Sequence, residues 1–406
     1  MIPFNRADRP TIEQEMFPRV LIVHCRYKFR GGEDIVVENE SSLLQRHGVG
    51  VSLYELSNES IDDSDLASRL LLGFRTTWNR QAANALRREV ERNGAQLVHF
   101  HNTFPLLSPA AYYAVKETGA KIVQTLHNYR LICGNAQLLR DLRPCEKCVG
   151  GKFFYGAVHR CYRGSLGASS AVALMQHTYH GIGTYRRMVD RYIALTEFAK
   201  RKFVTAGLPE ERIVVKPNSL VDTPESGEGN GNFVLYVGRL SAEKGVVALL
   251  RAWRQVRDVP LKIAGDGPLR DSLRELARDS RAAVEFLGHL DRRRVLDLMG
   301  EAKMLILPSE WYEGFPMTIA ESYAMGTPVV ASDIGSLSEI VEEGNTGRTF
   351  QPGNVDQLAS VVQSLFGDEV ALRSMRRNCR QRYLERYTGE DNARQLIAIY
   401  RDVTGT

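Results

Sequence analysis

Two carboxylates at a fixed spacing are the residues of this chain best placed to do chemistry. Glu313 and Glu321 bound the segment EGFPMTIAE, which is followed by SYAMGTPVVA. Pro316 favours the first turn of a helix, where its missing N–H is not needed, and Gly326 suits the helix's C-terminal end. The carboxylates therefore flank a helix N-terminus, whose unpaired N–H groups favour anions. We expect this arrangement to bind a phosphate that carries a polyhydroxyl group, with the carboxylates accepting hydrogen bonds from its hydroxyls.

Two cations precede a second expected helix. Arg239 and Lys244 lie in the segment GRLSAEKG, after the apolar run 233–237 and before a helix that should begin near Gly245. Positive charges beyond the end of a strand can neutralise a diphosphate, although a solvated turn would have the same composition. Together with the two carboxylates, they favour a binding site for a phosphorylated ligand.

A glycine-rich turn, GDGP, follows the apolar run 261–264. It resembles a shortened dinucleotide-binding fingerprint, but Arg270 occupies the place of the third glycine, which would permit close packing of helix and strand. A nicotinamide-dependent dehydrogenase is therefore disfavoured. We interpret the turn that contains Gly265 as a close backbone approach to a ligand or as a tight loop.

The elements that must position these residues alternate between short apolar runs and helical patterns. We expect strands at residues 20–23, 51–56, 97–101, 121–126, 192–195, 233–237, 261–264, 284–287, 304–307 and 328–331. This alternation predicts an α/β fold with two doubly wound parallel sheets that face each other across a cleft, and open sheets bind ligands beyond the carboxyl ends of their strands. The predicted parts are a flexible N-terminus (1–17), an N-terminal domain (18–222) with a cysteine-rich insertion near 131–165, a linker or loop (223–232), a C-terminal domain (233–387) and a terminal helix that returns to the first domain (388–406).

Size and charge agree with this organisation. The chain has 406 residues and a mass of 45.6 kDa, which is too long for one ordinary core and predicts two domains. Its net charge of +5 suits an anionic ligand or a membrane surface better than nucleic acid, which would require a concentrated basic face.

No apolar run reaches the roughly 18 residues that cross a bilayer. Six cysteines without a secretion signal indicate a reducing compartment, so we expect a cytoplasmic protein.

The order and spacing of the GRL-x-x-EKG run, the GDGP turn, the Gly288-His289-Leu290 segment and the two glutamates resemble glycosyltransferase family 4. Members of this family are retaining enzymes of the GT-B fold that use nucleotide sugars, and the resemblance covers residues from about 20 to 400. It implies that Arg239 and Lys244 bind the diphosphate of a UDP-, GDP- or ADP-sugar. It also implies that Glu321 holds the ribose hydroxyls and that Glu313 contacts the transferred sugar, with Glu313 either catalytic or only a sugar contact.

The same resemblance assigns further residues to the donor. They are Phe315, Met317 and Thr318 through their backbone N–H groups, Leu290 beside the base, Gly31 and Gly32 near the phosphates, and Gly265 in the glycine-rich turn. His127 would contact the sugar and is, with Glu313, the catalytic candidate. Without the resemblance, His127 could equally be a structural residue at a strand end, with its ring nitrogens hydrogen-bonded within the protein. His99 and His101 are expected to line the site or to support the structure.

Catalysis is expected to need no metal. Asp63 and Asp65 form the one close match to a metal-binding Asp-x-Asp pair, and we interpret them as a helix cap. Arg239, Lys244 and the helix N-terminus would stabilise the leaving diphosphate instead. Retention would follow from attack by the acceptor hydroxyl on the leaving-group face, with a phosphate oxygen taking its proton. A double displacement through a carboxylate is the alternative.

Four of the six cysteines lie close together in the sequence. Cys145 and Cys148 form a C-x-x-C pair, and Cys133 and Cys161 flank it at distances that suit a four-thiolate zinc site. The alternatives are four reduced thiols in an irregular insertion or a disulfide. A redox role for the C-x-x-C pair is disfavoured, because no helix pattern follows the pair as it does in redox proteins. Within the resemblance, such an insertion is typical of a subset that assembles surface polysaccharides.

An apolar run, 166–175, is followed by basic residues at 186–187 and 200–202. This part of the chain could rest on anionic lipid, or it could be a core helix with a solvated basic end. We therefore predict a retaining transferase that moves a sugar to a saccharide acceptor, lipid-linked at the inner face of the membrane. Three other functions fit parts of the sequence: a sugar-phosphate synthase or other small-acceptor enzyme of the same fold, a non-catalytic nucleotide-sugar binding protein, and a zinc-dependent interaction module.

Overall fold

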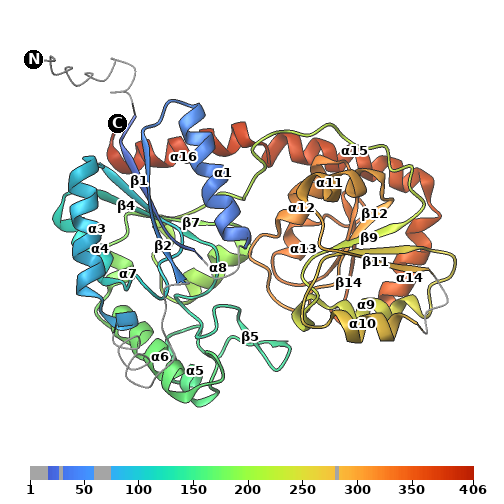
Figure 1. Ribbon diagram of the computed structural model, residues 1–406, viewed down its shortest axis with the longest axis horizontal. Helices are drawn as coiled ribbons and strands as arrows, with labels where there is room; N and C mark the ends of the chain where they lie inside the picture. Colours follow the sequence, from blue (N-terminus) through green and yellow to red (C-terminus); the bar gives the residue numbers. More distant parts are fainter. Residues whose placement is uncertain (1–16, 27–30, 59–74, 279–282) are drawn as a thin grey trace, which may run out of the picture.

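Two six-stranded parallel sheets, each covered by helices on both faces, form the protein (Figure 1). The computed structural model describes residues 17–26, 31–58, 75–278 and 283–406. The predicted α/β fold of two doubly wound sheets is confirmed. Asp63 and Asp65 lie outside the described residues, as does nearly all of the N-terminal segment that we expected to be flexible. Within the described part of the chain, no helix is long and apolar enough to cross a membrane.

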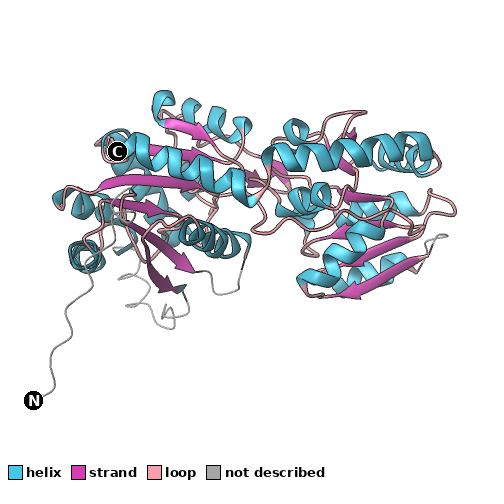
Figure 2. Cartoon of the chain, turned by 90° about the horizontal axis from the view of Figure 1, so that it is seen from above, coloured by secondary structure: helices cyan, strands magenta, loops and turns pink. Residues whose placement is uncertain are grey.

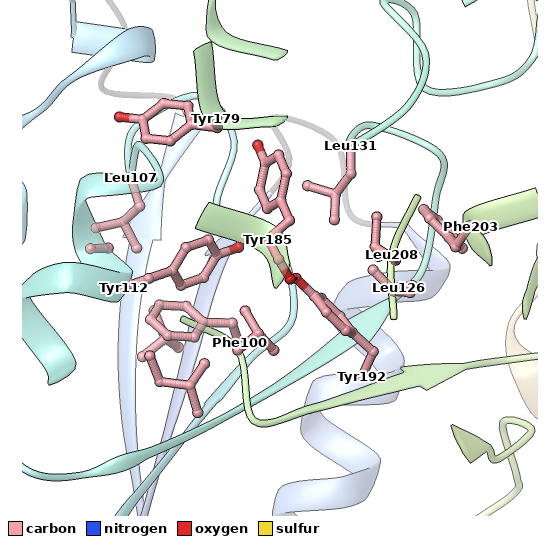
Figure 3. Packing of buried hydrophobic residues seen from close by; sticks show 14 of the residues in the cluster. Phe100, Leu107, Tyr112, Leu126, Leu131, Tyr179, Tyr185, Tyr192, Phe203 and Leu208 are labelled. Atoms are coloured by element: carbon pink, nitrogen blue, oxygen red, sulfur yellow. The ribbon is translucent and has the colours of Figure 1, made fainter. Parts of the chain in front are cut away.

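The N-terminal sheet has the strand order β2-β1-β3-β4-β7-β8. Its strands are β1 (Val20–Arg26), β2 (Val51–Ser57), β3 (Leu97–Phe100), β4 (Lys121–Leu126), β7 (Arg191–Ala194) and β8 (Ile213–Val215). The helices around it are α1 (Gly32–Arg46), α3 (Arg80–Asn93), α4 (Ala110–Glu117), α7 (Thr184–Arg187) and α8 (Glu197–Thr205). The central strands are almost wholly buried, as a sheet covered on both faces requires. Figure 3 shows the rings of Phe100, Tyr112, Tyr185 and Tyr192 in the core of this domain.

The C-terminal sheet has the order β11-β10-β9-β12-β13-β14, the doubly wound order 3-2-1-4-5-6 when counted along the chain. Its strands are β9 (Val234–Val237), β10 (Leu261–Ala264), β11 (Val284–Gly288), β12 (Met304–Leu307), β13 (Val329–Ser332) and β14 (Gly347–Phe350). The helices are α9 (Val246–Trp253), α10 (Arg270–Ala277), α11 (Arg292–Glu301), α12 (Met317–Ala324), α13 (Leu337–Ile340) and α14 (Val355–Phe366). We did not expect the edge strands β8 and β14, because β8 has only three residues and β14 contains only one apolar side chain, that of Phe350.

A long excursion separates β4 from β7 and contains little regular structure. It comprises the hairpin β5 (Leu139–Arg140) and β6 (Arg143–Pro144), then the helices α5 (Phe154–Val158) and α6 (Leu166–Gly181). Figure 1 shows α5 and α6 at one end of the N-terminal domain. Val172 and Met175 of α6 are buried, whereas Leu166 and Leu174 are exposed. The apolar run 166–175 is therefore partly a core helix and partly an uncovered surface.

The last two helices connect the domains. α15 (Glu369–Arg386) contacts α12, and α16 (Gly389–Thr404) contacts α1 of the N-terminal domain. Figures 1 and 2 show the two helices following one another along one side of the molecule. The side chain of Tyr400 in α16 is buried, and its hydroxyl lies 2.7 Å from Nδ1 of His99 in β3. The C-terminal helix thus packs one face against the N-terminal domain.

Candidate active site

The strand order of each sheet fixes where a ligand can enter. In the C-terminal sheet the order reverses between β9 and β12, and in the N-terminal sheet it reverses between β1 and β3. A crevice forms at such a point because the loops that follow the two strands diverge to opposite faces of the sheet. The segments that follow β9 and β12 carry Lys244 and Glu313, so these two residues belong to one crevice.

A buried ion pair joins the two loops of this crevice. Nζ of Lys244 lies 2.7 Å from Oε1 of Glu313, whose side chain is almost fully buried. The same oxygen accepts hydrogen bonds from Oγ of Ser309 at 2.7 Å and from Nε1 of Trp311 at 2.9 Å. Three donors on one carboxylate oxygen offset the cost of burying its charge. Glu313 is therefore held in one position, and it positions Lys244.

The segment that contains Arg239 also lies at the carboxyl end of β9. The side chain of Arg239 is exposed and has no partner among the described residues, so it is available to an anion. The glycine-rich turn packs against this segment: a Cβ at Gly265 would lie 1.9 Å from the carbonyl oxygen of Gly238, and one at Gly267 would lie 2.5 Å from that of Leu240. The N–H of Gly265 donates to the carbonyl of Gly288. These glycines permit two protein loops to meet, and Gly265 does not offer its N–H to a ligand here.

Helix α12 supplies the N-terminus that we expected between the two glutamates. Pro316 precedes its first residue, and the N–H groups of Met317 and Thr318 in the first turn have no intrahelical acceptor. The ring of Phe315 is buried and contacts that of Tyr387, so only the backbone of Phe315 can face a ligand.

Glu321 lies one turn further along α12. Burial raises its pKa, and Arg292 at 3.5 Å opposes that shift. A ribose that binds Glu321 would therefore have to share this carboxylate with Arg292. Leu290, two residues before α11, packs on the same core as Met317 and so lies at the same side of the domain.

The N-terminal domain contributes two glycines and a histidine. Gly31 and Gly32 begin α1 beyond the carboxyl end of β1, and neither adopts a positive φ angle. Among the described residues, a Cβ at Gly32 would meet nothing within 4 Å, and one at Gly31 would make only an ordinary contact. The fold itself therefore does not require glycine at these positions, which is compatible with the close approach of a ligand.

His127 follows β4 and is linked to a buried polar network. Its Nε2 lies 2.9 Å from Nδ1 of His101, and Nε2 of His101 lies 3.6 Å from Glu40. Glu40 in turn accepts a hydrogen bond from Nζ of Lys216 at 2.7 Å. Burial would raise the pKa of Glu40, but the ammonium group of Lys216 holds it below its usual value.

The imidazoles of this network are neutral at neutral pH. Burial lowers the pKa of His127 to about 4 and those of His99 and His101 well below the ordinary value. His127 can therefore donate or accept a hydrogen bond to a sugar hydroxyl without carrying charge. Glu40, His99 and His101 lie close enough to ligate a metal. However, both nitrogens of His99 are already hydrogen-bonded and Lys216 adds a positive charge, so these residues suit a hydrogen-bonded core.

The two domains meet beside Glu313. A Cβ at Gly314 would lie 2.8 Å from the carbonyl oxygen of His127, so the backbones of the two predicted catalytic segments are in contact. Tyr312, on the other side of Glu313, donates its hydroxyl to Glu146 of the excursion at 2.9 Å. The structure thus brings His127, Glu313 and Lys244 into one region between the domains.

Several residues of this region escaped the sequence analysis. Ser309 and Trp311 follow β12, where polar residues beyond a strand end could have been noticed, but nothing in the sequence pairs them with Glu313. The contacts of Arg292 with Glu321, of Glu146 with Tyr312 and of Glu40 with Lys216 join residues far apart in the chain. No local pattern predicts such pairs.

The four clustered cysteines also come together in space. Each of Cys133, Cys145 and Cys161 influences the pKa of Cys148 electrostatically, and all six cysteines of the chain are unpaired thiols. The disulfide that we considered is therefore absent from the structure. No three of these four sulfur atoms lie within 4.8 Å of one another.

Comparison with known proteins yields two family models that together span most of the chain. Residues 30–222 match the model described as Glycosyltransferase Family 4, and residues 222–382 match the model described as Glycosyl transferases group 1.

Two curated relatives each match less than half of the chain. A glycogen synthase of Mycobacterium tuberculosis is 39% identical over 173 residues, which cover 41% of this chain and 42% of the relative. An alpha-D-kanosaminyltransferase of Streptomyces kanamyceticus is 33% identical over 176 residues, which cover 42% of this chain and 45% of the relative. The aligned part therefore spans less than half of the length of these two relatives.

Solved structures resemble almost the whole chain. Alr3699/HepE of Anabaena in complex with UDP has a TM-score of 0.67 at 17% identity and covers 95% of this chain and 100% of its own. Sucrose-phosphate synthase (tll1590) of Thermosynechococcus elongatus has a TM-score of 0.70 at 17% identity, covering 96% of this chain and 99% of its own. At these identities the likeness concerns the fold alone, and it confirms the expected GT-B arrangement.

The buried histidines predict how stability depends on pH. An unfolded histidine binds a proton near pH 6.5, whereas folded His127 does so only near pH 4. Between these values the unfolded state binds more protons, so the free energy of unfolding falls as the pH falls through this window. Urea unfolding at several pH values should show this loss, and His127→Gln should reduce its slope.

His177 of α6 provides the matched control, because it is an exposed histidine of the same domain. His177→Gln should leave the pH slope as in the parent protein. A stability that stays constant between about pH 7 and about pH 5 would show that the histidines are not buried as neutral groups.

Proposed function

Because this chain belongs to the glycosyltransferases of GT-B fold, with a Family 4 model matching its N-terminal half and a group 1 model its C-terminal half, we propose that it transfers a sugar from a nucleotide-sugar donor to a saccharide acceptor. The observation that carries the proposal is the Lys244–Glu313 pair at the point where the C-terminal sheet reverses its order. Arg239, which has no partner among the described residues, and the N-terminus of α12 lie beside this pair. Together they offer positive potential for a diphosphate and carboxylates for sugar hydroxyls.

The donor that we propose is a uridine diphosphate sugar. The similar Anabaena protein was solved with UDP and with UDP-glucose, which supports this base over guanine or adenine. Arg239 and Lys244 would bind the diphosphate, Glu321 the ribose and Glu313 the transferred sugar. Gly31 and Gly32 would allow the N-terminal domain to approach the phosphates.

The reaction that we propose retains the anomeric configuration and needs no metal. The bond between the anomeric carbon and the diphosphate breaks, and the acceptor oxygen bonds to the same face of that carbon. The acceptor proton passes to a phosphate oxygen, and the donor leaves as a nucleoside diphosphate. Arg239, Lys244 and the α12 N-terminus would stabilise its charge, while neutral His127 would hold a sugar hydroxyl.

A lipid-linked acceptor is supported by an uncovered apolar surface on the excursion. Phe154 and Val158 of α5 are 56% and 64% exposed, and Leu166 and Leu174 of α6 are 54% and 58% exposed. Helix α6 carries no Asp, Glu, Lys or Arg. The segment 131–165 around it contains basic residues in excess over acidic ones, namely Arg140, Arg143, Lys147, Lys152, Arg160 and Arg163 against Asp141 and Glu146. Apolar side chains beside cations suit the surface of an anionic membrane.

Binding of nucleotides tests the donor site. We expect UDP to bind more tightly than GDP or ADP in isothermal titration calorimetry. Lys244→Met and Arg239→Ala should each weaken UDP binding by roughly ten- to hundred-fold, because each removes a charge-assisted hydrogen bond of about 1.5–3 kcal/mol. Glu321→Gln should weaken UDP but not inorganic pyrophosphate, since it would contact the ribose only.

Arg257 is the matched control for the cations. It precedes β10 and so lies at the amino ends of the strands, opposite the crevice. Arg257→Ala should bind UDP as the parent protein does. Equal affinities of all these variants for UDP would exclude the crevice as the donor site.

Vesicle binding tests the acceptor side. The protein should co-sediment with vesicles that contain phosphatidylglycerol, and less with pure phosphatidylcholine. Replacing Phe154 and Val158 together by serine should lower the partition coefficient at least about tenfold, because each side chain loses roughly 1.5–3 kcal/mol of burial in lipid.

The control replaces Val370 and Leu384, which are 72% and 51% exposed on α15, by serine in the same way. This variant should bind vesicles like the parent. If both double variants bind alike, or if transfer proceeds fully to soluble sugar phosphates without vesicles, the membrane acceptor is wrong and a small-acceptor enzyme of the same fold is favoured.

A further inference from the structure

We propose that Cys133, Cys145, Cys148 and Cys161 form a four-thiolate site for a structural zinc ion, which fixes the turn that contacts the Glu313 loop. The four residues come from separate parts of the excursion: Cys133 precedes the β5–β6 hairpin, Cys145 and Cys148 follow it, and Cys161 follows α5. A C-x-x-C pair with two further cysteines is the ligand pattern of structural zinc sites.

Backbone packing holds the cysteine-bearing segments against one another. Gly134 and Gly156 pack face to face, since a Cβ at Gly134 would lie 3.6 Å from Cα of Gly156. The same Cβ would lie 3.6 Å from Cβ of Cys161, and a Cβ at Gly156 would lie 3.9 Å from the sulfur of Cys148. These are ordinary van der Waals distances, so the segments that carry Cys133, Cys148 and Cys161 are in direct contact.

Burial raises the pKa of Cys133, Cys148 and Cys161 and so favours their thiol forms, while backbone N–H groups oppose that shift at two of these sulfur atoms. Backbone N–H groups of Asn135, Gln137 and Leu138 point to the sulfur of Cys133, and that of Gly156 points to the sulfur of Cys148. N–H donors of this kind stabilise negative charge on a ligand. The thiol of Cys133 is now hydrogen-bonded to Oδ1 of Asn135 at 2.9 Å. To share one ion, the four side chains would have to turn toward one another, because no three of their sulfur atoms lie within 4.8 Å of one another in the structure.

The excursion also needs a stabilising link. Six of the seven non-glycine residues with positive φ among the described residues lie in it, namely Ala136, Leu138, Asp141, Leu142, Arg160 and Arg163. Each such residue costs of order 1 kcal/mol, which the surrounding structure must offset. The apolar cluster around Cys148 contains only Phe153 and Ala173 as further buried members. A metal whose binding is coupled to folding would offset part of this cost.

The site would act on the crevice through Glu146, which lies between two of the ligands. Oε1 of Glu146 accepts hydrogen bonds from Nζ of Lys202 in α8 at 2.6 Å and from the hydroxyl of Tyr312 at 2.9 Å. The ring of Tyr312 also contacts that of Phe198, with centroids 4.8 Å apart. Because Tyr312 directly precedes Glu313, Glu146 is a positioning residue for the loop that carries Glu313. This consequence rests on the proposed function, whereas the metal site does not.

Metal analysis tests the zinc site independently of any activity. The full chain, purified without added chelator, should contain one zinc per chain by elemental analysis. A mercurial thiol reagent should release it from the folded protein. Replacement by Co²⁺ should give the visible absorption of a tetrahedral thiolate site. Cys145→Ser and Cys148→Ser should lose the metal.

Two buried cysteines outside the cluster provide matched controls. Cys25→Ser and Cys379→Ser should keep one zinc per chain. A parent protein that binds neither zinc nor Co²⁺, or a Cys148→Ser variant that retains full zinc, would overturn the proposal. Since thiol-triggered release is measured on the unmutated protein, a variant that fails to fold does not affect the conclusion.

Glu146→Gln and Tyr312→Phe test the positioning role. Each should lower kcat by about three- to tenfold while the affinity for the donor nucleotide stays unchanged, because only the placement of Glu313 is loosened. Lys147→Gln changes the neighbouring residue of the same turn, which faces the ring of Tyr155, and should leave kcat unaltered. An unchanged kcat in both Glu146→Gln and Tyr312→Phe would exclude the positioning role. If no transfer is detected even in the parent, the proposed function fails while the zinc count still stands.

Discussion

The carboxylate of Glu313 is the constraint on which the geometry of the crevice depends. It is buried, and one of its oxygens accepts hydrogen bonds from Lys244, Ser309 and Trp311. A buried charge is tolerable only with such partners, and the loss of Lys244 would leave the negative charge of Glu313 uncompensated. Because Lys244 follows β9 and Glu313 follows β12, their pair connects the two loops at the point where the sheet reverses. The N-terminal domain contacts the residues on both sides of Glu313, so the pair also fixes where the domains meet.

The two sides of the crevice differ in electrostatic character. The C-terminal side offers Arg239, Lys244 and a helix N-terminus, which together favour an anion. The N-terminal side offers glycines without crowding and a neutral imidazole, His127, supported by a buried network in which Lys216 compensates Glu40. Positive potential on one side and neutral hydrogen-bonding groups on the other suit a donor diphosphate and an uncharged sugar, respectively.

The sequence allowed the fold to be predicted more completely than the contacts within the site. Strand–helix alternation located ten of the twelve strands of the two large sheets. It missed β8 because that strand has only three residues, and β14 because most of its residues are not apolar. The types and order of Arg239, Lys244, Glu313 and Glu321 pointed to one crevice. Their pairing could not be predicted, because Lys244 and Arg292, the cationic partners of Glu313 and Glu321, come from other parts of the chain. The packing of the GDGP turn on a neighbouring loop also requires three-dimensional information, since a glycine that faces a ligand and one that faces protein look alike in sequence.

The structure of the protein with bound UDP would test the central claim most directly. The account predicts that the diphosphate lies between Nζ of Lys244, the guanidinium of Arg239 and the first turn of α12, with Glu313 still bonded to Ser309 and Trp311. The ribose should contact Glu321 in competition with Arg292. A nucleotide bound elsewhere, or a diphosphate beyond hydrogen-bonding distance of both cations, would contradict the account.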